Sequence, residues 1–144
     1  MTERLGDAHI QHFLASKAVV VLATLQADGS PLAMPMWFLH DPGALTMISV
    51  ANTQKVRNLE RDGRVSVVAE AGTGSDIRGV TIQGLVEFLL SESAERRSLV
   101  DRLLTKYDPH LECRWGGRAL PHDRMMFQIM PTRVTTWGLG APVH

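Results

Sequence analysis

The sequence predicts a mainly β fold with flanking helices, arranged as a small antiparallel barrel of about six strands. Short apolar runs rich in β-branched residues recur along the chain, separated by turns that contain Gly, Pro and Asp. Most consecutive runs are joined by tight turns instead of helices, which argues against a doubly wound parallel sheet. With 144 residues, 44% of them hydrophobic, the chain is expected to form a single domain, 1–144, with a buried core.

The N-terminal half contains the clearest hairpin. A short helix is expected after Asp7, which can cap it, because Ile10 and Leu14 fall on one face with other apolar residues. The pair Asp28-Gly29 between two apolar runs indicates a hairpin turn. The second strand contains two prolines, so we expect it at an edge of the sheet. The strands expected in this half are 19–25, 31–39 and 44–50.

The C-terminal half combines further strands with two helices. A short helix over 54–61 is expected to end at Asp62-Gly63, and a longer one over 91–107 has an apolar face. Gly84 lies inside a strand pattern and indicates a bulge or a close approach of two backbones. Residues 108–123 are expected to form an irregular loop. The strands expected here are 65–70 and 77–90, followed by one or two last strands over 125–130 and 134–137.

The composition of the chain argues against several classes of function. Lys and Arg together number 15, as do Asp and Glu, so no basic excess indicates a nucleic-acid partner. The longest apolar run, 18–23, is too short to cross a membrane, and no signal-peptide pattern follows Met1, so we expect a cytoplasmic protein. Cys113 is the only cysteine, which excludes an internal disulfide and a multi-cysteine metal site, and we expect no metal.

The segment 49–59 is the most informative part of the chain. An apolar strand ends here, Asn52 or Thr53 can cap the helix that follows, and Lys55 and Arg57 lie in its first turn. The first turn of a helix has unpaired N–H groups and the positive end of the helix dipole, so two cations there can hold a phosphate. Taken alone, these residues fit a solvated surface helix better than a phosphate site.

The sequence contains no self-sufficient catalytic group. It has no Gly-x-Gly-x-x-Gly, no P-loop pattern and no Gly-x-Ser-x-Gly, and its carboxylates are scattered over helices and turns. We therefore assign no catalytic residue. If the protein is an enzyme, we expect a cofactor to carry the reaction.

The order of the motifs resembles the pyridoxamine 5'-phosphate oxidase-like FMN-binding split barrels over about residues 8–138. The motifs are Asp28-Gly29-x-Pro31, Pro35-Met36-Trp37-Phe38, Lys55-x-Arg57-Asn58-Leu59 and Gln83-Gly84. The C-terminal pattern 131–138 looks like that of the deazaflavin-dependent branch, whose cofactor is coenzyme F420.

The resemblance implies a homodimer with a cofactor groove at the interface, closed by residues around 77–80 of the partner subunit. It implies that the ring system of the cofactor lies along two strands and that its phosphate is held at the start of the next helix. The cofactor-binding residues implied in this way are Met34, Pro35, Met36, Trp37, Ile48, Ser49, Thr53, Gln54, Lys55 and Arg57.

The implied reaction is hydride transfer from reduced coenzyme F420 to a small unsaturated organic substrate. An FMN-dependent, pyridoxamine-oxidase-like oxidoreductase is the alternative, although Gln54 stands where many FMN binders have a second basic residue. A non-catalytic cofactor- or haem-binding protein also stays open, with His40 as the candidate haem ligand. The polyglutamate tail of F420 would suit a basic strip made of Arg57, Arg61, Arg64 and Arg78.

Overall fold

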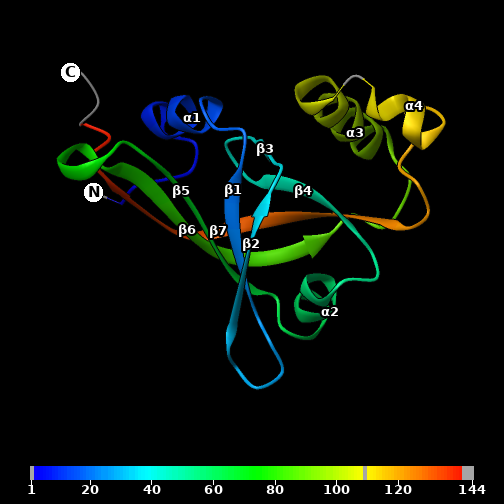
Figure 1. The fold of residues 1–144 in the computed structure, drawn as a ribbon, viewed down its shortest axis with the longest axis horizontal. Helices are drawn as coiled ribbons and strands as arrows, with labels where there is room; N and C mark the ends of the chain where they lie inside the picture. Colours follow the sequence, from blue (N-terminus) through cyan, green and yellow to red (C-terminus); the bar gives the residue numbers. More distant parts are fainter. Residues whose placement is uncertain (1, 109, 141–144) are drawn as a thin grey trace.

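The computed structural model describes residues 2–108 and 110–140 and shows one curled antiparallel sheet with helices around it (Figure 1). The helices are α1 (Ala8–Ala15), α2 (Gln54–Arg61), α3 (Ala94–Tyr107) and α4 (Leu111–Trp115), with a short 3-10 turn at Gly74–Asp76. The strands are β1 (Val20–Leu25), β2 (Pro31–Met36), β3 (Leu39–His40), β4 (Leu45–Val50), β5 (Arg64–Ala71), β6 (Arg78–Phe88) and β7 (Arg124–Trp137). The predicted fold class is confirmed, and the strand beyond the expected six is the two-residue β3.

The two edges of the sheet meet, which makes it a split barrel. The strand order is β2-β1-β5-β6-β7-β4-β3, so β2 and β3 lie at opposite edges. Yet β2 ends at Met36 and β3 begins at Leu39, and a chain of this length spans at most roughly 11 Å. The sheet must therefore curl until its edges are neighbours. The strand with two prolines lies at an edge, as predicted, because proline cannot donate to a second ladder.

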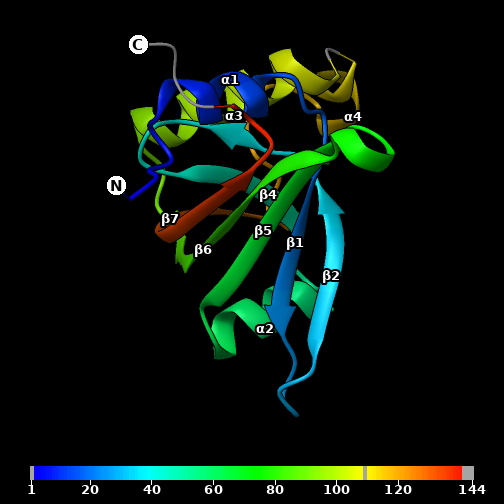
Figure 2. The same ribbon diagram turned by 90° about the vertical axis from the view of Figure 1, so that its left-hand side faces the viewer.

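Two apolar cores result from the alternation of side chains along the strands. The larger core fills the barrel, with α1 over one end, and contains Ile10, Leu14, Leu22, Met47 and Phe127, all under 2% exposed. The smaller core lies between α3 and the opposite face of β4 and β7 and includes Leu103, Leu104 and Met126. The outer face of β2, β1, β5 and β6 has no helix of the described chain over it (Figure 2).

Gly84 has the role that the sequence predicts. The register between β6 and β7 shifts between Gln83 and Gly84, which defines a bulge. A Cβ atom on Gly84 would lie against the carbonyl oxygen of Met130, closer than real side chains come to a backbone oxygen. Only glycine permits this approach of the two strands.

Two local expectations were wrong, and one that the sequence left open is settled. Asp7 stands at the N-cap position of α1, but its carboxylate accepts a hydrogen bond from the Arg4 N–H at 3.0 Å instead of capping the helix. Of the one or two last strands expected over 125–130 and 134–137, the structure has one, β7, because β6 pairs along nearly its whole length. Residues 108–123 include the helix α4. Among the helices described, none has the length and hydrophobicity needed to cross a membrane.

Candidate functional site

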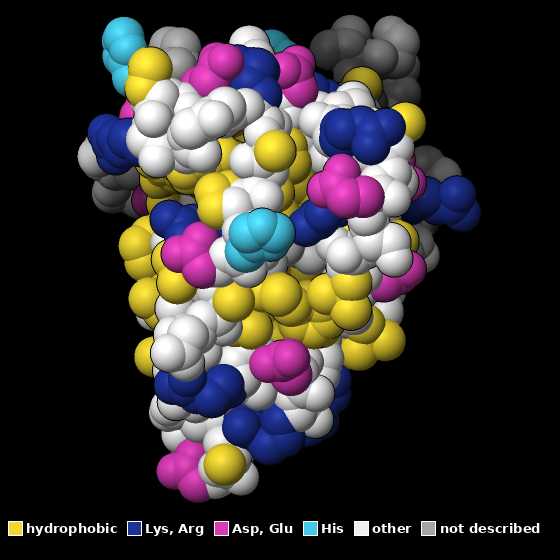
Figure 3. All heavy atoms as spheres, turned by 90° about the vertical axis from the view of Figure 1, so that its right-hand side faces the viewer, with side chains coloured by type: hydrophobic (Ala, Val, Ile, Leu, Met, Phe, Trp, Pro, Cys, Tyr) yellow, Lys and Arg dark blue, Asp and Glu magenta, His cyan; other side chains and the backbone are white. Residues whose placement is uncertain are grey.

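A cavity of about 360 Å³ opens at the end of β4, between α2 and the pair α3 and α4. Its volume is at the lower end of the range for small-molecule sites. Figure 3 shows this side of the molecule, where hydrophobic side chains form a band with Lys and Arg side chains above and below it. The lining consists of Pro35, Met36, Trp37, Ile48, Ser49, Val50, Lys55, Leu103, Leu104, Leu111, Trp115 and Arg124.

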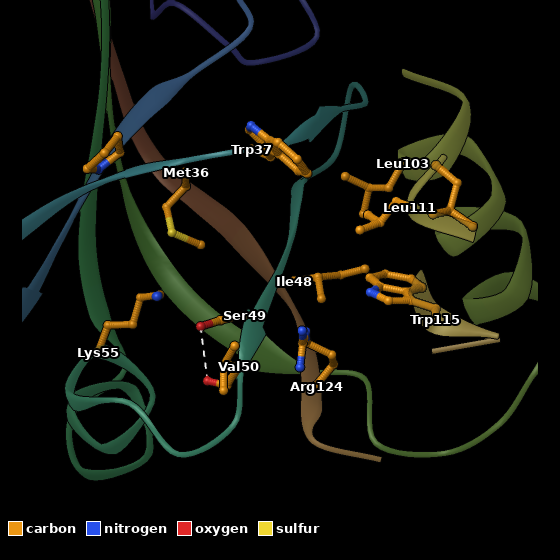
Figure 4. A pocket seen from close by; sticks show the side chains of 12 residues that line it. Met36, Trp37, Ile48, Ser49, Val50, Lys55, Leu103, Leu111, Trp115 and Arg124 are labelled. Atoms are coloured by element: carbon orange, nitrogen blue, oxygen red, sulfur yellow. Dashed lines mark hydrogen bonds between the residues drawn. The ribbon is translucent and has the colours of Figure 1, made fainter. Parts of the chain in front are cut away.

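The cavity has two sides because it reaches around the end of β4. Successive side chains of a strand point to opposite faces, so Ser49 and Val50 diverge. Ser49 shares its face with Met47, inside the barrel, whereas Val50 shares its face with Ile48, which packs against the core under α3. In Figure 4, Lys55 lies on one side of Ser49 and Val50, and Trp115 and Arg124 lie on the other. We call these the Lys55 side and the Arg124 side.

Lys55 is a partly buried cation in the first turn of α2. Its ammonium group has no hydrogen bond or ion pair with any residue that the structure describes, and burial lowers the pKa of Lys55 below its ordinary value. The hydroxyl of Thr53, at the N-cap position, donates to the Val50 carbonyl at 3.0 Å and so does not cap the helix. The start of α2 therefore presents a cation and uncapped N–H groups together, which favours a bound anion.

A buried asparagine holds α2 against the barrel. Asn58 is 0% exposed, and its amide donates to the Thr24 hydroxyl on β1 at 3.0 Å. Its carbonyl oxygen accepts hydrogen bonds from Gln54 at 2.8 Å and from Arg61 at 3.1 Å. These contacts fix the helix that carries Lys55, because a buried polar group must keep its partners.

Trp37 forms the rim of the cavity at the crossover between β2 and β3. Its ring stacks on Tyr107 of α3, with the centroids 4.7 Å apart and the planes 6° from parallel. The Tyr107 hydroxyl accepts a hydrogen bond from the Phe38 N–H and donates to the Phe38 carbonyl, each at 2.8 Å. Lys106 donates to the same carbonyl at 2.8 Å. The end of α3 thus fixes the crossover, and burial raises the pKa of Tyr107.

The structure brings together six of the ten predicted site residues in this cavity: Pro35, Met36, Trp37, Ile48, Ser49 and Lys55. The other four lie nearby. Met34 is paired with Leu22 further along β2. Gln54 donates to Asn58, and Arg57 donates to Asn52 and Gln54, so these side chains stabilise the local structure of α2.

Sequence reasoning missed the wall formed by α3, α4 and β7. The predictions do not include Val50, Leu103, Leu104, Leu111, Trp115 and Arg124. Trp115 could have been predicted as a site residue, because a tryptophan in an otherwise polar stretch indicates a buried or binding position. Arg124 had no such signal, because only the register of β7 places it opposite Val50.

Two further sequence hypotheses change in the light of the structure. His40 does not line the cavity; its Nδ1 lies 2.8 Å from the Gln11 side-chain oxygen, and burial, with a smaller effect of Lys106, lowers the pKa of His40. The basic strip does not form within one chain. Arg64 and Arg78 lie at opposite ends of the β5–β6 hairpin, and Arg64 is paired with Asp62 at 2.8 Å, which lowers the pKa of Asp62 to about 2.

Comparison with known protein families shows to which family the chain belongs. The family profile described as pyridoxamine 5'-phosphate oxidase matches residues 7–138. The chain belongs to this family. We therefore compare the chain with solved structures that share the pyridoxamine 5'-phosphate oxidase fold.

Solved structures with this fold have diverse functions. The conserved hypothetical protein Rv2991 from Mycobacterium tuberculosis is 28% identical, with a TM-score of 0.76 over 96% of this chain and 89% of that one. The haem storage protein HutZ from Vibrio cholerae is 19% identical, with a TM-score of 0.73 over 92% and 94%. An FAD-binding protein from Mesorhizobium loti is 21% identical, with a TM-score of 0.68 over 87% of each chain. The last two share the fold, and fold alone does not transfer a ligand.

Proposed function

We propose that this member of the pyridoxamine 5'-phosphate oxidase family is an oxidoreductase that uses coenzyme F420 to reduce a small unsaturated organic substrate. The observation that carries the proposal is Lys55, a partly buried cation without a described partner, at the uncapped start of α2 and at the edge of an apolar cavity. A cation desolvated in this way is costly unless an anion binds to it, and the phosphate of a cofactor is such an anion.

The residues present fit a flavin-type group. Lys55 and the N–H groups at the start of α2 would hold the phosphate, and Met36, Trp37 and Ser49 would border the ring system. The cavity of about 360 Å³ suits a ring system better than a whole cofactor, which agrees with a groove completed by a second subunit. When bound, the cofactor would supply hydride transfer.

The chain itself would contribute positioning and exclusion of water. Apolar side chains from β2, β4, α3 and α4 line the cavity and would hold a substrate against the cofactor. Ser49, buried in the wall, donates its hydroxyl hydrogen to the Val50 carbonyl at 3.1 Å and so orients no proton toward the cavity. The described lining holds no carboxyl group and no histidine, so we propose that solvent supplies the proton.

A homodimer through the uncovered face of the sheet completes this proposal. On this face Val21 of β1 is the cross-strand neighbour of Pro35 on β2 and of Val68 on β5, and Val21 is 37% exposed. Apolar residues repeated on an uncovered sheet face favour burial against another surface. Residues around 77–80 of a second subunit would then close the groove, and Ile77 is 53% exposed in the single chain.

The decisive experiment is fluorescence titration of the purified protein with coenzyme F420 and, separately, with FMN. Lys55→Met should weaken the binding of the preferred cofactor at least tenfold, because a charge-assisted hydrogen bond is lost. Lys17→Met is the matched control, since the Lys17 ammonium bonds the Glu70 carbonyl away from the cavity. Tighter binding of FMN than of F420 would replace the cofactor in this proposal, and binding that Lys55→Met leaves unchanged would refute the phosphate site.

Haem binding is the competing function suggested by the fold of HutZ. No observation in the cavity favours it, because the part of the lining that the structure describes offers no histidine, cysteine or tyrosine as an axial ligand. Haemin added in the same titration should produce no Soret shift that depends on the cavity residues.

A further inference from the structure

The Arg124 side of the cavity has a composition that the proposed cofactor site does not explain. Its walls are the apolar side chains of α3 and α4 and the outward face of β4, with a single arginine at the start of β7. The cofactor residues Met36, Ser49 and Lys55 lie on the other side of the end of β4 (Figure 4). An apolar chamber with one placed polar group is the usual form of a site that orients a small ligand.

Arg124 is held in this position by the sheet. It is the cross-strand partner of Val50, so the two side chains share one face, and Ile48 and Met126 form the next pair on that face. The side chain of Arg124 is 27% exposed, and Trp115 of α4 lies beside it in Figure 4. Its backbone N–H donates to the Pro121 carbonyl at 3.1 Å, which fixes the start of the strand.

The guanidinium of Arg124 retains donors for a ligand. Its described ion pair joins Nη1 to the Asp123 carboxylate at 2.8 Å, and Asp123 is 71% exposed and does not line the cavity. Because Asp123 is largely in solvent, this ion pair is screened by water and competes weakly with a ligand. Two cations and no carboxylate line the described cavity, although the whole protein has no net charge.

We infer that the Arg124 side binds the substrate and that the substrate is an apolar organic acid, with its anionic group on Arg124 and its unsaturated body between Trp37 and Trp115. This inference rests on the proposed function for the presence of a cofactor on the Lys55 side. Arginine suits the role because its planar fork binds carboxylate and sulfonate groups through two hydrogen bonds. Arg124 is then the residue that selects acids over neutral compounds of the same shape.

Two fluorescent probes with the same ring framework distinguish binding at the Arg124 side of the cavity from binding at the Lys55 side. Anilinonaphthalene sulfonate carries an anionic group, and N-phenylnaphthylamine lacks it. The wild-type protein should bind the sulfonate about tenfold more tightly than the neutral probe, because hydrogen bonds to a charged group add that much affinity. Arg124→Met should remove this preference and leave the affinity for the neutral probe unchanged, whereas Arg124→Lys should keep part of it.

Three control variants locate the effect. Trp115→Ala should weaken both probes, and Lys55→Met should leave the preference for the sulfonate in place. Arg97→Met removes an exposed arginine of α3 that is not part of the lining and should also have no effect. The inference is overturned if Arg124→Met keeps the preference for the sulfonate, if Lys55→Met removes it, or if Trp115→Ala leaves both probes bound.

Titration with coenzyme F420 makes the two proposals fail separately. Arg124→Met should bind F420 as tightly as the wild type, because the cofactor phosphate lies on the Lys55 side. Loss of F420 binding in Arg124→Met would assign the arginine to the cofactor and overturn the inference. If the wild-type protein binds no F420 or FMN while the probes behave as stated, the proposed function fails but the organic-acid site remains.

Discussion

Asn58→Leu should destabilise the protein and loosen the helix that carries Lys55. The substitution keeps the approximate volume of the side chain but removes its hydrogen bonds to Thr24, Gln54 and Arg61. Arg61 is exposed and Gln54 is at the surface, so both can turn to water. The Thr24 hydroxyl cannot, because Thr24 is 1% exposed and has no other partner among the described side chains.

The free energy of unfolding should fall by about 2–3 kcal/mol. A buried hydroxyl left without a partner costs about 1–3 kcal/mol, and each lost hydrogen bond that water can replace costs less. Thr24→Val should cost a similar amount, because it leaves the Asn58 amide without its acceptor. The double variant, Asn58→Leu with Thr24→Val, removes both partners and should recover at least about 1 kcal/mol relative to the sum of the single changes.

Urea denaturation followed by circular dichroism, at one fixed protein concentration, measures these differences. The double-mutant cycle is the decisive quantity, since it does not depend on how the leucine packs. Additive costs, with a coupling near zero, would refute the view that this hydrogen bond anchors α2. The same variants should weaken cofactor binding without any change to a cavity residue.

Three further predictions test other features. Gly84→Ala should destabilise the protein by about 1–3 kcal/mol in the same assay, because its methyl group would displace a β7 carbonyl, whereas Gly43→Ala, with open space around it, should be nearly neutral. Tyr107→Phe keeps the stacking but removes both hydrogen bonds to Phe38, so the free energy of unfolding should fall by about 1–2 kcal/mol; an unchanged value would mean that α3 does not fix the crossover. Because burial lowers the pKa of Lys55 in the folded state, the wild type should gain stability relative to Lys55→Met as the pH rises toward the ordinary lysine value of 10.5, and a difference that does not vary with pH would contradict this.

The elements that local chemistry specifies could be predicted from the sequence. The Asp28-Gly29 turn sets the first hairpin, and Gly29 has the positive φ, 86°, that such a turn requires. Two prolines placed β2 at an edge. The helix over 54–61 was predicted with the residue range that the structure shows.

The features that could not be predicted from the sequence depend on contacts between distant segments of the chain. The length of β7 follows from its pairing with β6 and β4, which no local pattern of 124–137 reveals. Arg124 enters the cavity only through its register with Val50. Conversely, Gln54 and Arg57 have the residue types of a phosphate site, but their side chains bond to their own helix and the segment before it. Type and spacing identified the segment 49–59, and tertiary geometry selected which side chains face the cavity.

The place of β7 in the sheet has a consequence for how the chain folds. It lies between β6 and β4, so it completes two ladders at once, and the second of them joins residues about 80 positions apart in sequence. Before 124–137 are available, β4 and β6 each present an unpaired edge, and such edges favour association with other chains. Folding that waits for a distant strand is slow, because the loop must close before the contacts form. A nascent chain of this protein is therefore most prone to aggregate just before its last strand emerges from the ribosome.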